Sequence, residues 1–533
     1  MTARAHLGRD TMAAALYQRG HIYTGQPSRP WADAMLVCCG RVVWAGAASE
    51  LGTGLPAEPV DLAGATVLPG LTDAHTHLLY HALLAQRINL RASRSLAEAL
   101  AAIAAYARAH PERAWILGHG WNENLWPEGR LPNRADLDSA VPDRPAVLTR
   151  ADYHLAWANS RALEAAGVTA GTADPPGGRV ERDEHGEPTG ILRERAAALV
   201  LDVAPSPSLS ERTQALLAAQ AEAHSLGLVG VHTMEGAECL EALQDLRAHG
   251  ELSLRVLVVP PCHLLPELRA LGLRPGFGDE WLRLGQLKLF ADGSLGSHTA
   301  WMLQPFEDDP ANLGMPANSP DELERLIREA HGAGWPCAVH AIGDAANRAV
   351  LGAIERAGRS PSSLPDRIEH VQIIQPEDMP RLARLGVVAS MQPVHVASDW
   401  AVASRLWGER ARFSYAWRSL LAHGAVLAFG SDAPVEPLNP WAGLQVAVTR
   451  RDLAGQPPAG WYPAERLTLA EALAGFSSGA AFAAGEPRQG ALAPGCRADF
   501  VLLERDPFTV PPEELGQLRP MATFVAGNRV YPT

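Results

Sequence analysis

Two histidines at the end of an apolar run are the first sign of chemistry in this sequence. His75 and His77 stand two residues apart, and Asp73 precedes them by the same spacing. In a β-strand, residues two apart point to the same side, so both imidazoles can share one cation. The alternative is that two histidines lie on a half-buried strand without a ligand, and the motif alone does not decide between the two.

Four further side chains of the metal-ligand type follow along the chain: Lys288, His340, His370 and Asp432. A single buried residue of these types is usually structural, with its hydrogen bonds satisfied. Here each one stands at or near the end of a separate apolar run, where an α/β barrel gathers its catalytic groups. The combined set of six predicts a metal site rather than six unrelated structural residues.

The elements that must position these residues are short apolar runs that alternate with helix-like stretches, the pattern of a parallel sheet. Helices are predicted at residues 321–331 and 376–385. Eight strands of this kind predict a (β/α)₈ TIM barrel, and hence an α/β protein. The predicted strands cover residues 67–77, 228–234, 254–260, 284–293, 336–344, 367–371, 387–393 and 425–434.

The domain organisation follows from where the other β-prone segments fall. Both chain ends are β-rich, which predicts a small antiparallel sheet near the N-terminus and one discontinuous β-sandwich over residues 15–66 and 485–533. The barrel then spans residues 67–484. Strand-like runs at 114–121 and 145–152 are assigned to a large insertion after the first barrel strand, residues 91–207, because so long a stretch is rarely a loop.

Composition limits the partners and the compartment. With 46 basic and 59 acidic side chains the formal charge is -13, and without a long basic run a nucleic-acid partner is not expected. No uncharged apolar run is long enough for a membrane helix or a signal peptide. The six scattered cysteines form no CxxC pair, which is typical of a reducing cytoplasm. The oligomeric state is left open, a homodimer included.

Several longer motifs resemble those of one enzyme family. They are LPGLTDAHTHL, GWNENLWPEGRLPNRADLD, GEPTGILRE, LKLFADGSLGS, AVHAIGDAANRAV, RIEHVQI, SMQPVH and AFGSDAPVEP. Together with the order HxH, Lys, His, His, Asp, they are similar to the amidohydrolase superfamily of metal-dependent hydrolases. Within it they resemble amidohydrolase family 3, the group similar to N-substituted formamide deformylase. The resemblance covers residues 15–529.

The resemblance implies a division of labour among the six residues. His75 and His77 bind one metal that Asp432 completes, and His340 and His370 bind a second metal. Lys288 would bridge the two after carboxylation by CO₂, because a carbamate offers two anionic oxygens that a lysine amine lacks. The alternative is a single metal held by His75, His77 and Asp432. In either case Zn²⁺ is the first candidate.

The resemblance also implies hydrolysis of a non-peptide carbon–nitrogen bond in a small molecule: an amide, an N-formyl or N-acyl group, or a cyclic amide. Metal-bound water is the nucleophile, and Asp432 acts as general base and then general acid. The alternative for Asp432 is ligation without proton transfer. Alternatives for the protein are an ester or lactone hydrolase, a deaminase, and a non-catalytic regulatory protein that retains the metal site.

Candidate substrate-binding residues are Trp121, His154, Gln392 and His395. Trp121 belongs to a group of tryptophans in the insertion that could line an apolar pocket or simply pack together. His154 closes a stretch that reads Asp-Gly-His in the family, and Tyr153 stands here in place of the glycine. Gln392 and His395 follow the seventh predicted strand, where they could contact substrate or support a ligand.

Overall fold

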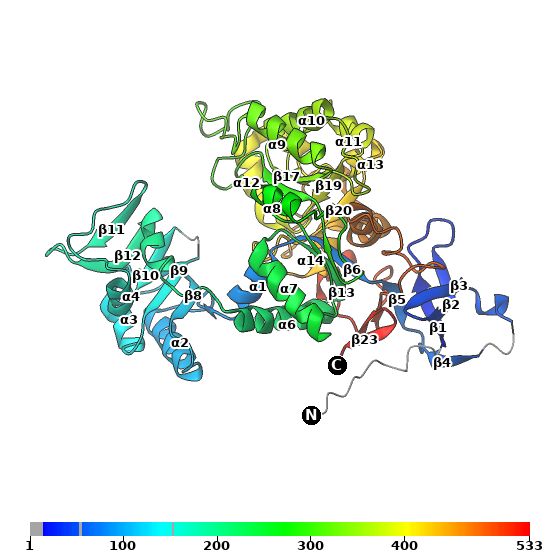
Figure 1. Ribbon diagram of the computed structural model, residues 1–533, viewed down its shortest axis with the longest axis horizontal. Coiled ribbons are helices and arrows are strands. Elements are labelled where there is room, and N and C mark those ends of the chain that lie inside the picture. Colours follow the sequence, from blue (N-terminus) through cyan, green and yellow to red (C-terminus); the bar gives the residue numbers. More distant parts are fainter. Residues whose placement is uncertain (1–13, 53–55, 152–153, 533) are drawn as a thin grey trace. The chain divides into compact units, whose positions relative to one another are not determined.

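The computed structural model describes residues 14–52, 56–151 and 154–532 (Figure 1). It is an α/β structure in two compact units. The first unit contains residues 1–79 and 216–533, and the second contains residues 80–215. The predicted insertion, residues 91–207, lies within the second unit.

An eight-stranded mixed sheet in the first unit combines strands from both ends of the chain. Its order is β23-β22-β21-β5-β1-β2-β3, with β4 paired to β1. The strands are β1 (Ala14–Tyr23), β2 (Trp31–Cys38), β3 (Arg41–Gly46), β4 (Ala57–Asp61), β5 (Thr66–Pro69), β21 (Phe500–Leu503), β22 (Ala522–Val525) and β23 (Asn528–Tyr531).

The prediction of an antiparallel sheet near the N-terminus was wrong in part. Strands β1, β2 and β3 are antiparallel, but β4 and β5 both run parallel to β1. The reason is that the chain leaves β3, crosses over and returns along the free edge of β1, where β4 and β5 follow one another. A crossover of this kind brings the chain back in the same direction as β1, whereas a hairpin reverses the direction of the chain.

Two parallel sheets form the centre of the first unit. One has the order β15-β14-β13-β6 and the other the order β16-β17-β18-β19-β20. The strands are β6 (Leu71–Thr76), β13 (Leu228–Thr233), β14 (Arg255–Val258), β15 (Leu282–Leu284), β16 (Leu287–Phe290), β17 (Cys337–Ala341), β18 (Arg367–His370), β19 (Val388–Met391) and β20 (Leu427–Phe429). A strand forms within each predicted range, but two ranges are split: residues 67–77 are divided between β5 of the mixed sheet and β6, and the fourth range is divided between β15 and β16.

Hydrogen bonds connect the end strands of these two sheets. The chain passes directly from β15 to β16 across Gly285 and Gln286. At the other side, the amide of Asp432 donates to the carbonyl of His75 at 2.7 Å, and the amide of His77 donates to the carbonyl of Ala433 at 2.8 Å. The carboxyl ends of β6 and β20 are thereby held side by side.

Helices surround the strands of the parallel sheets (Figure 1). Both predicted helices are present, as α9 (Pro320–Gly332) and α11 (Met379–Leu385). Helix α9 begins at a Ser319 cap and buries one apolar stripe, which includes Leu323 and Ile327. The others in this unit are α7 (Ala237–His249), α8 (Leu265–Ala270), α10 (Asp344–Ala357), α12 (His395–Trp407), α13 (Trp417–Ala422), α14 (Pro440–Thr449), α15 (Leu469–Ala474) and α16 (Ala480–Ala483).

The second unit has its own sheet, of order β11-β12-β10-β9-β8-β7. Its strands are β7 (Ile88–Asn89), β8 (Ile116–Trp121), β9 (Ala146–Arg150), β10 (Leu155–Ala158), β11 (Gly178–Arg182) and β12 (Pro188–Glu194). Its helices are α2 (Leu96–Ala109), α3 (Arg134–Ala140), α4 (Ser160–Ala165) and α5 (Ala198–Leu201), and α1 (Leu78–Ala85) and α6 (Leu209–Ser225) lie at its two ends. The strand-like runs predicted within the insertion are β8 and β9.

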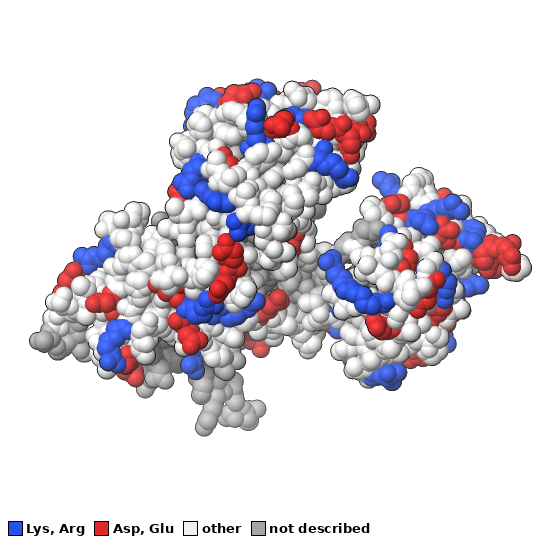
Figure 2. Space-filling model, turned by 180° about the vertical axis from the view of Figure 1, so that it is seen from behind, with Lys and Arg blue, Asp and Glu red and all other residues white. Residues whose placement is uncertain are grey.

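The surface carries charges of both signs. On the face drawn in Figure 2, Lys and Arg side chains are interspersed with Asp and Glu, and uncharged residues separate them. Over the ranges that the structure describes, no helix combines the length and the apolar character that a bilayer crossing requires.

Candidate metal centre

Asp73 ties the end of β6 to the turn that follows β20. Its Oδ1 accepts hydrogen bonds from the backbone amides of His75 and Ser431, both at 3.0 Å. Burial raises the pKa of Asp73 to about 6, although these donors favour the carboxylate. The residue thus places the ends of β6 and β20 next to one another, and with them the two histidines and Asp432.

His75 has the arrangement of a metal ligand. Its ring is buried, and Nδ1 lies 2.6 Å from Oε2 of Glu369. Since an ionised carboxylate only accepts, Nδ1 carries the proton and Nε2 keeps its lone pair. Nε2 is buried and has no hydrogen-bond partner within the described residues. Burial lowers the pKa of His75 to about 4, which leaves the ring neutral, as a ligand must be.

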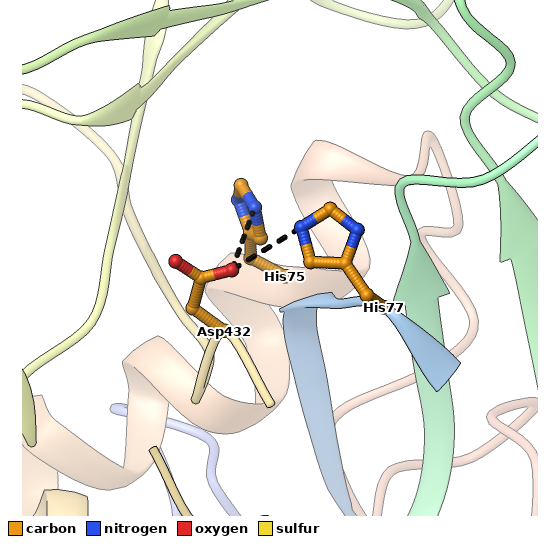
Figure 3. A group of neighbouring side chains, drawn as sticks. All are labelled: His75, His77 and Asp432. Atoms are coloured by element: carbon orange, nitrogen blue, oxygen red, sulfur yellow. Dashed lines mark ion pairs between the residues drawn. The ribbon is translucent and has the colours of Figure 1, made fainter. Parts of the chain in front are cut away.

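Asp432 faces His75 and His77 from the end of β20 (Figure 3). Its Oδ1 lies 3.4 Å from Nε2 of His75 and 3.4 Å from Nε2 of His77. Burial would raise the pKa of Asp432, but its contacts with the histidines outweigh burial and hold it well below the usual range. These three ligand atoms lie within 4.8 Å of one another and form one possible cation group.

Asp432 also belongs to a second group of possible ligands, together with His370 and His395. Oδ2 of Asp432 lies 3.8 Å from Nε2 of His395 and 4.0 Å from Nδ1 of His370. Nδ1 of His370 donates to Oε1 of Gln392 at 2.8 Å, which leaves Nε2 of His370 as the nitrogen that could bind a cation. His395 was predicted to contact substrate. In the structure it also belongs to this group of possible metal ligands, which the sequence did not indicate. Its role in substrate binding stays a prediction, as does that of Gln392.

His340 and Lys288 lie beside this group with other contacts. Nε2 of His340 donates to the carbonyl of Gly293 at 2.8 Å. Lys288 is buried, its Nζ lies 5.1 Å from the ring centre of Phe290, and burial lowers its pKa. A lowered lysine pKa favours the free amine that carboxylation requires. The ligand roles of both residues stay predictions.

Trp121 and His154 belong to the second unit. Trp121 is fully buried in a core cluster with Trp126 and Trp157, and its Nε1 donates to the carbonyl of Leu148 at 2.9 Å. His154 is exposed, and its Nδ1 lies 3.0 Å from Oε1 of Glu194. Substrate contact by either residue stays a prediction. Tyr153, the departure from the family pattern, lies outside the described residues.

Glu369 is a functional residue that the sequence reasoning missed. It holds Nδ1 of His75 and is itself held by Arg367, whose Nε lies 2.6 Å from Oε1 of Glu369. Both side chains of this ion pair are fully buried. Burial would raise the pKa of Glu369, but Arg367 and His75 outweigh it and keep the carboxylate ionised. The sequence held a signal for this pair, because two oppositely charged residues that stand two apart in a short strand share one face of it.

A cavity of about 280 Å³ lies beside these groups. Its wall contains both polar and apolar side chains. It is lined by Ser294, Leu295, Gly296, His340, Ile342, His370, Gln372, His395, Ser398, Asp399, Asp432 and Val435. A substrate of modest size can therefore reach the carboxylate that faces both groups of ligand atoms.

The residues present fit a divalent cation. An orphaned buried nitrogen such as Nε2 of His75 costs free energy unless it has a partner. Two imidazoles and one carboxylate are a donor set that zinc binds, and three protein ligands leave a position for water or substrate. The backing of His75 by a carboxylate is also the usual support of a metal-bound histidine.

Comparison with known proteins gives concordant matches over nearly the whole chain. The model of a family described as "Amidohydrolase family" matches residues 58–531. The chain is 31% identical to N-substituted formamide deformylase of Arthrobacter pascens, over 94% of this chain and 95% of that protein. It is 35% identical to Protein LONG AFTER FAR-RED 3 of Arabidopsis thaliana, over 98% and 92% of the two chains.

A solved structure also resembles this one closely. It is described as an uncharacterized metal-dependent hydrolase from Pyrococcus furiosus and superposes with a TM-score of 0.80. The sequence identity is 31%, and the match covers 93% of this chain and 100% of that one.

Proposed function

The chain belongs to the amidohydrolase family, and from this premise we propose that it hydrolyses an amide bond with a metal held by His75, His77 and Asp432. As a member, it is a hydrolase that acts on carbon–nitrogen bonds other than peptide bonds. The observation that carries the proposal is the neutral, buried His75, whose Nε2 points at Asp432 without a hydrogen-bond partner in the described structure.

A metal held by these residues would supply a water whose pKa is near neutral and would polarise the scissile carbonyl. Asp432 then takes a proton at one carboxylate oxygen and delivers it to the leaving nitrogen. The first task requires an ionised carboxylate, and the lowered pKa keeps Asp432 in that form at neutral pH. Glu369 holds the proton of His75 at Nδ1 and so fixes the direction of that ring.

A second metal is part of the proposal. His340 and His370 would hold it, with carboxylated Lys288 between the two ions. The lowered pKa of Lys288 supports this assignment. His395 is a competing donor, because its Nε2 lies in the ligand group of His370 and Asp432. Metal stoichiometry distinguishes one ion from two.

We also propose that the two parallel sheets are halves of one (β/α)₈ barrel. The bonds of Asp432 and His77 to the opposite strand, and the direct passage from β15 to β16, support closure on both sides. The mixed sheet, built from residues 14–69 and 500–531, would be the flanking β-sandwich.

The proposed substrate is an N-formyl or N-acyl compound, or a cyclic amide. The name of the Arthrobacter pascens relative supports an N-substituted formamide as the first compound to try. Esters, lactones and deamination substrates are the alternatives, because the same groups can activate water toward them.

Metal analysis combined with a substrate screen tests the proposal. The purified protein should hold one or two equivalents of divalent metal, and it should release formate or another acid from N-benzylformamide, N-acyl amines or cyclic amides. Removal of the metal by a chelator should abolish turnover, and Zn²⁺ should restore it. A stably folded protein that binds no metal and cleaves no amide would contradict the proposal.

A further inference from the structure

One wall of the cavity carries a carboxylate that the proposed hydrolysis does not use. Asp399 and Gln372 both line the cavity that Asp432 also lines. Asp399 stands on α12 four residues after His395, and residues at this spacing lie on the same face of a helix. The face that contributes His395 to the ligand group therefore also contributes Asp399 to the cavity.

Asp399 is held in place by donors from two other segments. The hydroxyl of Tyr415 donates to Oδ2 of Asp399 at 2.6 Å, and the amide of Gln372 donates to the same carboxylate. Tyr415 is fully buried, and its backbone amide donates to the carbonyl of Gln372 at 2.8 Å. These contacts fix the carboxylate before any ligand arrives, which lowers the entropic cost of binding.

Gln372, which also lines the cavity, holds a second acceptor. Its side chain is 4% exposed, and its Oε1 has no hydrogen-bond partner in the part of the chain that the structure describes. A buried acceptor of this kind costs free energy until a donor reaches it. The wall thus offers an amide oxygen beside a carboxylate.

Asp399 has no strong counter-charge in this wall. Neither Lys nor Arg is among the residues that line the cavity. Burial raises the pKa of Asp399, and His395, Tyr415 and Gln372 offset this only in part. A partly buried carboxylate without a cation is costly, and a cationic ligand removes that cost.

Building on the proposed function, we propose that Asp399 and Gln372 form a subsite for a cationic, hydrogen-bond-donating group of the substrate. The group is an ammonium, amidinium or guanidinium carried by the same molecule as the scissile amide. Its N–H donors reach the Asp399 carboxylate and Oε1 of Gln372. Leu295 and Ile342 provide apolar contact for the chain that joins it to the amide.

The subsite predicts an order of preference among ligands of one shape. A cationic group binds best, a neutral isostere binds less well, and an anionic one binds worst because it meets Asp399. Charge-assisted hydrogen bonds are strong enough to separate the cationic from the neutral ligand by about 10-fold or more.

Butylguanidinium and butylurea are a matched pair of probes for calorimetric binding to the full-length, metal-loaded protein. Guanidinium is a poor metal ligand, so its binding reports on the wall rather than on the metal. The wild type should bind butylguanidinium about 10-fold more tightly than butylurea, and Asp399→Asn should remove the difference. Glu436→Gln is the control, because Glu436 accepts a hydrogen bond from Ser398 but does not line the cavity.

Equal affinity of the wild type for the two probes would overturn the subsite, and so would a preference that survives in Asp399→Asn. If Asp399→Asn does not fold, Gln372→Met removes the second acceptor and should reduce the preference about 3-fold or more. Hydrolysis of the neutral N-benzylformamide is measured separately. A wild-type protein that hydrolyses this compound but shows no preference between the probes refutes the subsite alone, whereas a wild-type protein that shows the preference but hydrolyses no amide refutes the proposed function alone.

Discussion

At the scale of single residues, Asp432 has two separable roles. It contacts four imidazoles and can therefore hold a cation, and the proposed mechanism also makes it the proton carrier. A carboxamide keeps the size of the side chain, but it cannot take up a proton near neutral pH and it bears no negative charge. Substitution by Asn therefore tests both roles at once, provided that metal content is measured alongside rate.

The variant Asp432→Asn should lower kcat by about 10²–10⁴-fold, the range that general acid–base catalysis contributes. Steady-state hydrolysis of the best amide substrate and metal analysis of the same sample give the two readouts. Glu436→Gln, a nearby carboxylate outside the ligand groups, should retain wild-type kcat. A metal-loaded Asp432→Asn protein with a normal rate would show that Asp432 is not the base.

Glu369 acts on the metal through His75. The variant Glu369→Gln should weaken metal affinity by about 10–100-fold, because the carboxylate no longer fixes the tautomer and direction of the ring. Competition with a chelator measures this affinity. The control variant Glu471→Gln breaks a different Arg–Glu pair, the one with Arg418, and should leave metal affinity unchanged. Equal metal affinity of wild type and Glu369→Gln would contradict the positioning role.

At the scale of elements, one buried imidazole joins helix α9 to the amino-terminal ends of strands β17 and β18, the strand ends opposite to the metal centre. His331, in the last turn of α9, places Nδ1 2.7 Å from the carbonyl of Gly358 and Nε2 2.9 Å from Oδ1 of Asp366. The same Oδ1 accepts from the amide of Cys337, where β17 begins. Burial alone would lower the pKa of His331, but the hydrogen bond with Asp366 outweighs it and raises the pKa.

This contact makes stability depend on pH. The pKa of His331 in the folded protein lies above the unfolded value of about 6.5. The contribution of His331 to the free energy of unfolding is therefore complete below pH 6.5 and is lost as the pH rises through the folded pKa. The variant His331→Gln should lose about 1–3 kcal/mol of unfolding free energy at pH 6 and clearly less at pH 9.

Urea unfolding of wild type and His331→Gln at both pH values measures the difference. The exposed His423→Gln is the matched control, and its difference from wild type should stay within about 0.5 kcal/mol at each pH. A loss in His331→Gln that is constant or grows toward pH 9 would contradict the assignment of a charged imidazole.

At the scale of the whole molecule, one buried ion pair ties the mixed sheet to a parallel sheet within the first unit. Nε of Arg255, on β14, lies 2.7 Å from Oδ2 of Asp499, and Nη2 lies 2.9 Å from Oδ1. Asp499 directly precedes β21, so the pair joins the middle of the chain to its C-terminal strands. The bidentate geometry satisfies both charges where water is excluded.

The variant Asp499→Asn should lower the free energy of unfolding by about 3–5 kcal/mol, because it removes the bidentate partner of the buried Arg255 guanidinium, and the nearest remaining carboxylate, that of Glu280, lies 3.8 Å away. Urea unfolding at pH 7 measures this loss. Asp279→Asn breaks the exposed pair with Arg247 and should cost about 1 kcal/mol or less. Similar losses for the two variants would show that the buried pair does not hold the sheets together.

Local sequence patterns predicted much of this structure. They indicated the eight apolar runs, helices α9 and α11, and the six residues of ligand type, because strand and helix periodicity are properties of neighbouring residues. The parallel pairing of β4 and β5 with β1 was not found. It depends on which edge of β1 the chain meets after β3, and no short-range pattern records that choice.

The sequence by itself determined which residue types stand at the strand ends and therefore which chemistry is available: imidazoles, a carboxylate and a lysine that suit a divalent metal. Only the tertiary structure decided their partners. It placed Glu369 behind His75, His395 beside Asp432, and Asp399 with Gln372 in the cavity wall. These contacts join residues that can be hundreds of positions apart, and they exist only once packing has excluded water and brought the strand ends together.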